Sequence, residues 1–186
     1  PLHGNFGACI TDVVLSGVMN ADTLTSLRRA IDDYSFLCFP NQDMNDEKHI
    51  AFTQLLGEPE AEHVRFGSTG EINYLGTVGN VKDDGNLQDE LNARYQSGNQ
   101  LWHSDSSFRE IPSFVSILHA YEVPPTGGET EFASMRAGYR RLSQDQQRHI
   151  APLHVIHDYV FSRSMVAPVN PNHAASLPPV MHPLVR

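Results

Sequence analysis

The sequence predicts a protein of the α+β class, with helices first and short strands after them. Apolar residues recur at helical spacing in two N-terminal segments, 21–34 and 46–56. Beyond residue 100, short apolar runs are separated by turns rich in Pro and Gly, which is typical of strands. No internal repeat is visible, so we expect a single domain over residues 1–186.

The first helix is expected at 21–34. One face of this segment is apolar and carries Leu24, Leu27 and Ile31. We expect Asp22 to cap the helix, because its carboxylate can accept from free backbone N–H groups. The apolar run that follows, 35–40, is short and ends at Pro40, so it predicts a strand.

The second helix is expected at 46–56, with Asn45 as its cap and Gly57 as its stop. Acidic residues in the first turn suit the positive end of the helix dipole. Its core face is expected to consist of Phe52, Leu55 and Leu56.

The stretch 57–100 is rich in Gly and predicts loops, with one strand at 71–78. Long polar loops often cover binding sites, so we expect 80–98 to move and to become ordered when a ligand binds. Disorder is the competing interpretation of this segment.

The second half of the chain alternates strand and turn signals. Further strands are expected at 114–122, 129–134 and 153–161. Pro and Gly predict a turn at 124–128, and Ser143 with Gln146 forms a capping-box pattern at the start of a helix. The proline-rich segment 167–183 is expected to be a loop.

The composition is consistent with a soluble globular enzyme of the cytoplasm. There are 22 acidic against 13 basic residues, a net charge of −9, which argues against nucleic acid as a partner. Neither a membrane span nor a secretory leader is visible. The two cysteines, Cys9 and Cys38, lie in apolar runs and are expected to pack as small hydrophobic residues in a reducing compartment.

The run LWHSDSSF (101–108) places His103 and Asp105 two residues apart. In a strand, residues at this spacing point to the same face, so an imidazole and a carboxylate would project together. These are two of the three ligands of the 2-His-1-carboxylate triad, which binds Fe(II) and leaves positions open for substrate and oxygen. The pattern is common, and a surface His beside a solvated Asp is the alternative.

Four segments together resemble the taurine / 2,4-dichlorophenoxyacetate dioxygenase (TauD/TfdA) family. They are FGACITDVVLSG (6–17), GNQLWHSDSSF (98–108), PPTGGETEFASMRAGYRRLS (124–143) and LPPVMHPLVR (177–186). The resemblance implies a double-stranded β-helix (jelly-roll) with an N-terminal helical cap. It also implies a Fe(II)- and 2-oxoglutarate-dependent dioxygenase that uses O2 to hydroxylate a small organic acid, namely a carboxylate, aryloxyalkanoate or sulfonate, with succinate and CO2 as coproducts. The family often forms homo-oligomers.

The resemblance also implies roles for individual residues. His103 and Asp105 match the metal ligands and catalytic centre, while Thr130 and Asn99 match residues near 2-oxoglutarate. His63 and Arg65 fall where the taurine branch contacts the substrate anion. The competing interpretations are an ordinary strand Thr for Thr130 and an exposed loop His for His63.

In this family, the second metal-binding His and the Arg that pairs with 2-oxoglutarate follow the HPLVR segment, which here ends at Arg186. We therefore expect the third ligand and this Arg to lie outside residues 1–186, in a longer enzyme whose barrel is incomplete here. The other histidines do not lie where the family places the ligand: His119, His154, His157, His173 and His182. Two alternatives stay open: a truncated or non-catalytic jelly-roll that binds ligands, and a cupin-like metal enzyme with another reaction.

Overall fold

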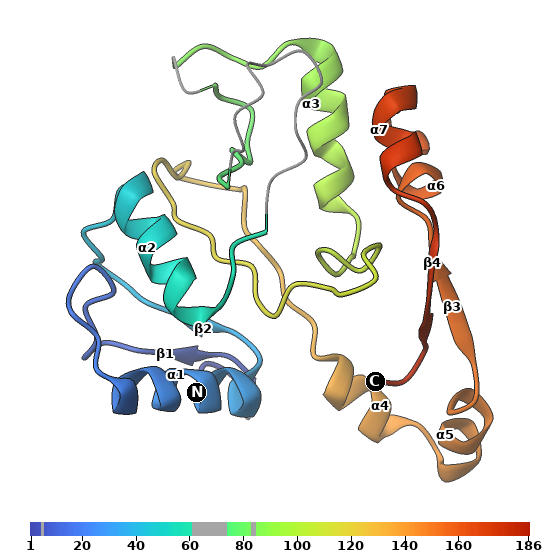
Figure 1. The fold of residues 1–186 in the computed structure, drawn as a ribbon, viewed down its shortest axis with the longest axis horizontal. Coiled ribbons are helices and arrows are strands. Elements are labelled where there is room, and N and C mark those ends of the chain that lie inside the picture. Colours follow the sequence, from blue (N-terminus) through green and yellow to red (C-terminus); the bar gives the residue numbers. More distant parts are fainter. Residues whose placement is uncertain (5, 61–73, 83–84) are drawn as a thin grey trace. The chain divides into compact units, whose positions relative to one another are not determined.

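The computed structural model describes residues 1–4, 6–60, 74–82 and 85–186, and it divides into two compact units. Unit 1 combines residues 1–59 with 117–142, and unit 2 combines residues 60–116 with 143–186. The single-domain expectation stays a prediction. Helices and short strands are both present, as the α+β prediction requires (Figure 1).

Unit 1 is built around a short parallel strand pair with a helical connection. Its elements are β1 (Ala8–Cys9), α1 (Ala21–Tyr34), β2 (Leu37–Cys38), α2 (Asp46–Leu56) and α4 (Met135–Arg141). In the register, Ala8 pairs with Leu37 and Cys9 with Cys38. Parallel strands need a crossover connection, which α1 supplies while it also contacts β2 and α2 (Figure 1).

Helix α1 begins at Asn20, whose side chain accepts from the backbone N–H of Thr23 at 2.8 Å. The expectation that Asp22 caps this helix is wrong, because Asp22 already lies inside the first turn. Helix α2 begins as expected, with the Asn45 side chain accepting from the Lys48 N–H at 2.9 Å.

The core face of α2 differs in one position from the sequence expectation. Phe52 and Leu56 are buried as predicted, but Leu55 is 40% exposed. The third buried residue is His49, because positions 49, 52 and 56 share one face of a helix with 3.6 residues per turn. An imidazole therefore takes a position in the core of unit 1 that apolar periodicity does not reveal.

Segment 117–142 joins unit 1 through aromatic packing. Phe36, beside β2, makes an edge contact with Phe6 and stacks on Phe132 with ring centroids 4.3 Å apart. The turn at 124–128 is confirmed, since Gly127 and Gly128 adopt positive φ angles of 78° and 75°.

The strands expected at 114–122 and 129–134 are wrong. Both segments lack an assigned strand partner in the described residues, and strand structure requires a hydrogen-bonded neighbour as well as a suitable pattern. The expectation for the cysteines is also wrong, because Cys9 and Cys38 are exposed. Their strands are only two residues long and leave the side chains at the surface.

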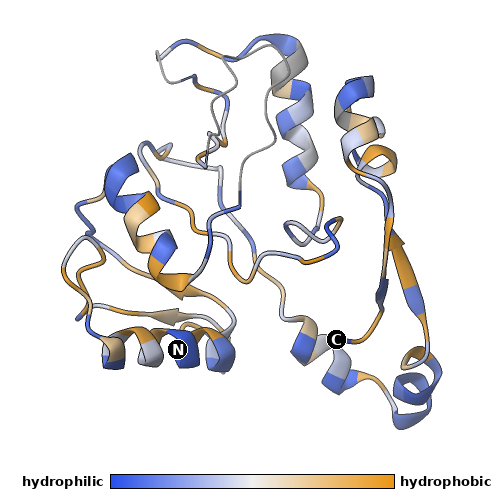
Figure 2. Cartoon of the chain, viewed as in Figure 1, coloured by the Kyte–Doolittle hydropathy of each residue, from blue (hydrophilic) through white to orange (hydrophobic). Residues whose placement is uncertain are grey.

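Unit 2 combines short helices with an antiparallel two-stranded sheet. Its elements are α3 (Glu90–Ser97), the 3-10 helix η1 (Gly98–Gln100), α5 (Gln144–Ile150), β3 (His154–His157), α6 (Tyr159–Ser164), α7 (Pro171–Ser176) and β4 (Val180–Pro183). In the β3–β4 register, His154 pairs with Pro183 and His157 with Val180. Figure 2 shows α5 as mostly polar, whereas β3 has two apolar residues, Val155 and Ile156, between two histidines.

The sequence predicted unit 2 less well than unit 1. Helix α3 lies inside 80–98, which was expected to be a loop, and 167–183 contains α7 and β4. The strand expected at 153–161 ends at His157, because Asp158 accepts from the Phe161 N–H at 2.9 Å and starts α6. The capping box at the start of α5 is confirmed.

The strand expected at 71–78 is not found over 74–78, and residues 71–73 lie outside the described residues. No helix in the described part of the chain is both long and apolar enough to cross a membrane.

Candidate metal centre

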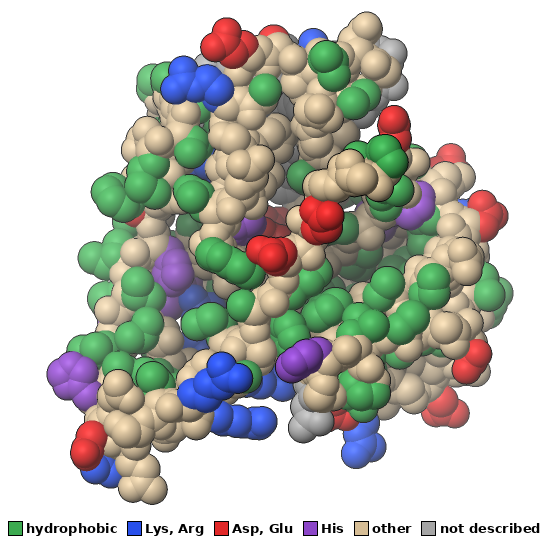
Figure 3. Space-filling view, turned by 180° about the vertical axis from the view of Figure 1, so that it is seen from behind, with side chains coloured by type: hydrophobic (Ala, Val, Ile, Leu, Met, Phe, Trp, Pro, Cys, Tyr) green, Lys and Arg blue, Asp and Glu red, His purple; other side chains and the backbone are tan. Residues whose placement is uncertain are grey.

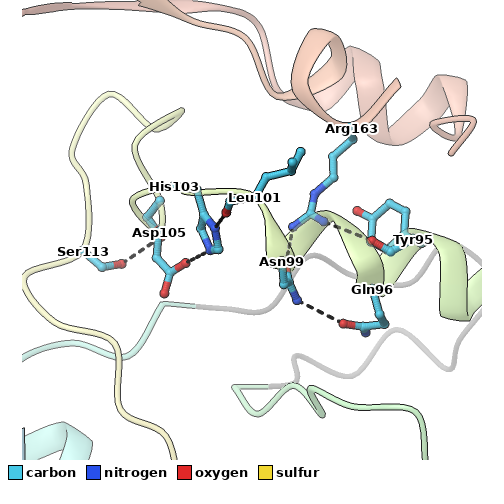
Figure 4. Close-up of polar contacts among 9 residues, drawn as sticks. Tyr95, Gln96, Asn99, Leu101, His103, Asp105, Ser113 and Arg163 are labelled. Carbon is cyan, nitrogen blue, oxygen red and sulfur yellow. Dashed lines mark hydrogen bonds and ion pairs between the residues drawn. The ribbon is translucent and has the colours of Figure 1, made fainter. Parts of the chain in front are cut away.

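The segment that carries His103 and Asp105 is irregular, so the expected strand is wrong. Helix η1 ends at Gln100 and a turn begins at Asp105, which leaves only four residues between them, the first of which, Leu101, has an extended backbone. The two side chains nevertheless meet: His103 Nε2 lies 3.1 Å from Asp105 Oδ1 (Figure 4). Extended backbone alone is sufficient to bring residues i and i+2 to one side.

The ring of His103 is held in a defined orientation. Its Nδ1 lies 2.6 Å from the backbone oxygen of Leu101 (Figure 4). A carbonyl oxygen only accepts, so Nδ1 carries the hydrogen and Nε2 is the nitrogen that faces Asp105. Metal-binding histidines commonly use their second nitrogen in this way, because the hydrogen bond fixes the tautomer.

The spacing of the two side chains fits a shared metal ion. An octahedral metal with ligand bonds of about 2.1 Å holds neighbouring ligand atoms roughly 3.0 Å apart, close to the 3.1 Å between Nε2 and Oδ1. The side chains of His103 and Asp105 are 44% and 56% exposed, so an ion can reach them. In the described residues, no group of three His, Cys, Asp or Glu side chains could hold a metal.

Asn99, in η1, is tied to the neighbouring helices. Its Oδ1 accepts from Arg163 Nη2 at 2.9 Å, and its Nδ2 donates to Gln96 Oε1 at 3.1 Å (Figure 4). Arg163 also donates to the backbone oxygen of Tyr95 at 3.2 Å and lies over the Tyr95 ring. An amide has two donor hydrogens and two lone pairs, and these contacts within the described residues use one of each.

Thr130 belongs to unit 1 and has an exposed side chain, two residues after the Gly127–Gly128 turn. The predicted substrate residues His63 and Arg65 lie outside the described residues. The roles of Thr130, His63 and Arg65 therefore stay predictions.

Beside the metal motif, Tyr159 forms part of the core of unit 2. Its ring packs on Phe108, with centroids 4.8 Å apart, and its hydroxyl is hydrogen-bonded to that of Tyr95. Burial, with a further contribution from the Tyr95 hydroxyl, raises the pKa of Tyr159 far above its usual value. Tyr159 is therefore a neutral phenol at physiological pH.

Sequence reasoning missed Glu60. Its carboxylate contacts three side chains from the turn after Asp105 and the residues beyond it: Ser106, Arg109 and Ser113. The backbone oxygen of Arg109 lies 2.8 Å from His182 Nε2, in β4. These partners are separated from Glu60 and His182 by tens of residues, and a single sequence carries no signal for such pairs.

Comparisons with known proteins identify the family of this chain. The family model described as "Taurine catabolism dioxygenase TauD, TfdA family" matches residues 1–186. The chain belongs to this family, which confirms the resemblance found in its motifs.

Two curated relatives are dioxygenases that act on phenoxyalkanoates. The alpha-ketoglutarate-dependent 2,4-dichlorophenoxyacetate dioxygenase of Cupriavidus pinatubonensis is 34% identical, and the match covers 100% of this chain and 67% of the relative. The (S)-phenoxypropionate/alpha-ketoglutarate-dioxygenase of Sphingobium herbicidovorans is 32% identical, over 88% of this chain and 54% of the relative. The chain thus spans between about half and two thirds of these relatives.

Solved structures show the same fold. The crystal structure of AAD-2 in complex with Mn(II) and N-oxalylglycine matches with a TM-score of 0.85 and 32% identity, over 98% of this chain and 65% of AAD-2. A taurine dioxygenase from Burkholderia xenovorans matches in fold with a TM-score of 0.70, over 98% of this chain and 56% of that one.

Proposed function

We propose that this chain is part of a Fe(II)- and 2-oxoglutarate-dependent dioxygenase and supplies two of its three metal ligands. The observation that carries the proposal is the His103–Asp105 pair. One ring nitrogen is hydrogen-bonded to a backbone oxygen, and the other lies 3.1 Å from a carboxylate oxygen. The proposal assigns the third ligand, and the Arg that pairs with 2-oxoglutarate, to the part of its relatives that residues 1–186 do not match. The proposal also includes the jelly-roll fold, of which residues 1–186 would form only a part.

The proposed roles of the residues follow from their chemistry. His103 and Asp105 hold the metal, and the carboxylate offsets part of its charge. Bound Fe(II) with 2-oxoglutarate supplies the activation of O2 and the oxidation of a C–H bond, with succinate and CO2 as coproducts. Asn99 offers one remaining donor and one acceptor to the cosubstrate, and Thr130 offers a hydroxyl. The complex of AAD-2 with Mn(II) and N-oxalylglycine supports a metal beside an oxo-acid ligand in this fold.

The proposed substrate is a small organic acid that is hydroxylated, either a carboxylate, an aryloxyalkanoate or a sulfonate. Relatives are named for 2,4-dichlorophenoxyacetate, (S)-phenoxypropionate and sulfate esters, all of which are small anions. Because the chain carries a net charge of −9, such an anion needs a local cation. Arg65 is the proposed partner, since a guanidinium can bind a carboxylate through two hydrogen bonds.

The test measures succinate formation by the full-length protein with Fe(II), 2-oxoglutarate and a panel of aryloxyalkanoates and sulfonates. We expect His103→Ala and Asp105→Ala each to lower turnover by at least about 100-fold, because each removes a metal ligand. His149→Ala, which changes an exposed histidine in α5, is the matched control and should keep full activity. Full activity in either ligand variant would contradict the proposal.

The same assay separates the proposal from its alternatives. Ligand binding without succinate formation would favour a non-catalytic jelly-roll module. Turnover that does not depend on O2 and 2-oxoglutarate would favour a metal enzyme with another reaction.

A further inference from the structure

The turn that follows Asp105 has an unusual backbone. Ser106 adopts a φ angle of 53°, in the left-handed region that residues other than glycine seldom occupy. A conformation of this kind costs free energy and persists only where the surroundings hold it. Because Ser106 directly follows a proposed metal ligand, whatever holds this turn also directs the Asp105 carboxylate.

Contacts that could hold the turn converge on Glu60. The Ser106 hydroxyl donates to Glu60 Oε2 at 2.8 Å, and the Ser113 hydroxyl donates to the same oxygen. Arg109 Nε lies 2.5 Å from the other oxygen, Oε1. The carboxylate thus contacts both ends of the segment from Ser106 to Ser113, and the two serine oxygens lie only 3.2 Å apart.

The surroundings strengthen these contacts. The side chains of the Glu60–Arg109 ion pair are 34% and 28% exposed, so this pair is partly shielded from water, whereas the bonds from Ser106 and Ser113 lie at the surface. The other side of the segment is fixed as well, because the Arg109 backbone oxygen lies 2.8 Å from His182 Nε2. Strand β4 and Glu60 therefore hold the same turn at two places.

We propose that Glu60 is a positioning residue for Asp105, acting through Ser106, Arg109 and Ser113, an inference that rests on the proposed metal site. Glu60 does not contact the metal in this scheme. Its carboxylate keeps the segment 106–113 closed, and the closed turn keeps Asp105 beside His103 before a metal binds. Without Glu60, part of the binding free energy would be spent on ordering the turn, and metal affinity would fall.

The first experiment titrates Mn(II) into the full-length protein by calorimetry and measures the melting temperature of the metal-free protein. We expect Glu60→Ala to weaken Mn(II) binding by roughly 10- to 100-fold, the usual effect of removing a residue that orients a metal ligand. Glu58→Ala is the matched control, because Glu58 is an exposed acidic residue two positions away. It should leave affinity within twofold of the wild type.

Ser113→Ala provides a second variant, in which the metal ligands and Ser106 keep their wild-type identity. We expect it to weaken Mn(II) binding several-fold, and to have no further effect in a protein that already carries Glu60→Ala. Residues of one network couple in this way, whereas independent contributions to folding would add. This variant and Glu60→Gln also serve if Glu60→Ala does not fold.

Two negative outcomes are distinguishable. If His103→Ala abolishes Mn(II) binding but Glu60→Ala, Glu60→Gln and Ser113→Ala bind within twofold of the wild type, the positioning role is overturned and the metal site stands. If the wild-type protein does not bind Mn(II), or His103→Ala binds it equally well, the metal site itself is overturned and the role of Glu60 with it.

Discussion

The orientation of the His103 ring is set by its surroundings. Two hydrogen-bonding neighbours, the Leu101 oxygen and the Asp105 carboxylate, orient the ring. The sequence predicted the pairing of His103 with Asp105, because residues two apart in extended backbone share a side. It did not predict Glu60, because contacts to Ser106 and Ser113 arise only when distant segments fold together. Local pairs in this site were therefore predictable and long-range ones were not.

At the same scale, the hydroxyl pair of Tyr95 and Tyr159 is open to a direct test. Tyr159→Phe keeps the ring that packs on Phe108 and removes the hydroxyl that is hydrogen-bonded to Tyr95. We expect the free energy of unfolding to fall by about 1 kcal/mol, the typical net contribution of one hydrogen bond. Urea unfolding of the two single variants and the Tyr95→Phe/Tyr159→Phe double variant measures it. Strictly additive losses would show that the hydroxyls do not interact.

At the scale of elements, helices were more predictable than strands. The bounds of α1 and α2 follow from local signals, namely an apolar face and a cap such as Asn45. A strand also needs a partner, and the alternating segment 114–122 has none assigned among the described residues. The local pattern therefore favours an extended backbone in this segment, but a strand forms only where a partner lies beside it.

Substitution of Asn20 and of Asp22 tests which of these two residues caps α1. We expect Asn20→Ala to lower the free energy of unfolding by about 1 kcal/mol, because it removes the bond to the Thr23 N–H. Asp22→Ala should cost only a few tenths of a kcal/mol, through weaker interaction with the helix dipole. Chemical unfolding of both variants checks this, and a larger loss for Asp22→Ala would reverse the assignment.

The stability of the protein should depend on pH through His157, in the β3–β4 sheet. Burial, with smaller contributions from the charges of Arg186 and His182, lowers the pKa of His157 below its usual 6.5. As the pH falls below about 6.5, the unfolded chain takes up this proton before the folded chain does. This contribution to stability is therefore complete above pH 6.5 and is lost as the pH falls through the lowered pKa.

Urea unfolding at pH 7.5 and at pH 5.5 measures this effect. We expect the wild-type protein to lose more stability between the two values than His157→Gln does, because glutamine does not titrate. His154→Gln, at an exposed position of the same strand, is the control. An equal loss in the wild type and in His157→Gln would show that His157 does not contribute.

At the scale of the whole molecule, the described residues bury few large side chains and leave many apolar ones at the surface. The buried hydrophobic residues are Ala8, Leu15, Leu27, Phe52, Leu56, Tyr159, Ala167 and Leu177. Figure 3 shows apolar side chains spread over the visible face, and Trp102, beside His103, is itself 69% exposed.

The division of the chain into units has a consequence for its biosynthesis. Residues 60–116 of unit 2 are inserted between the two segments of unit 1, and residues 143–186 follow both. Because a ribosome adds roughly 5–20 residues per second, 1–59 emerges several seconds before 117–142 can join it. During that interval residues 1–59 lack the stacking of Phe36 on Phe132. Unit 1 can therefore form only after residue 142 has been synthesised, and unit 2 only after residue 186, so neither unit can be completed from the residues that emerge first.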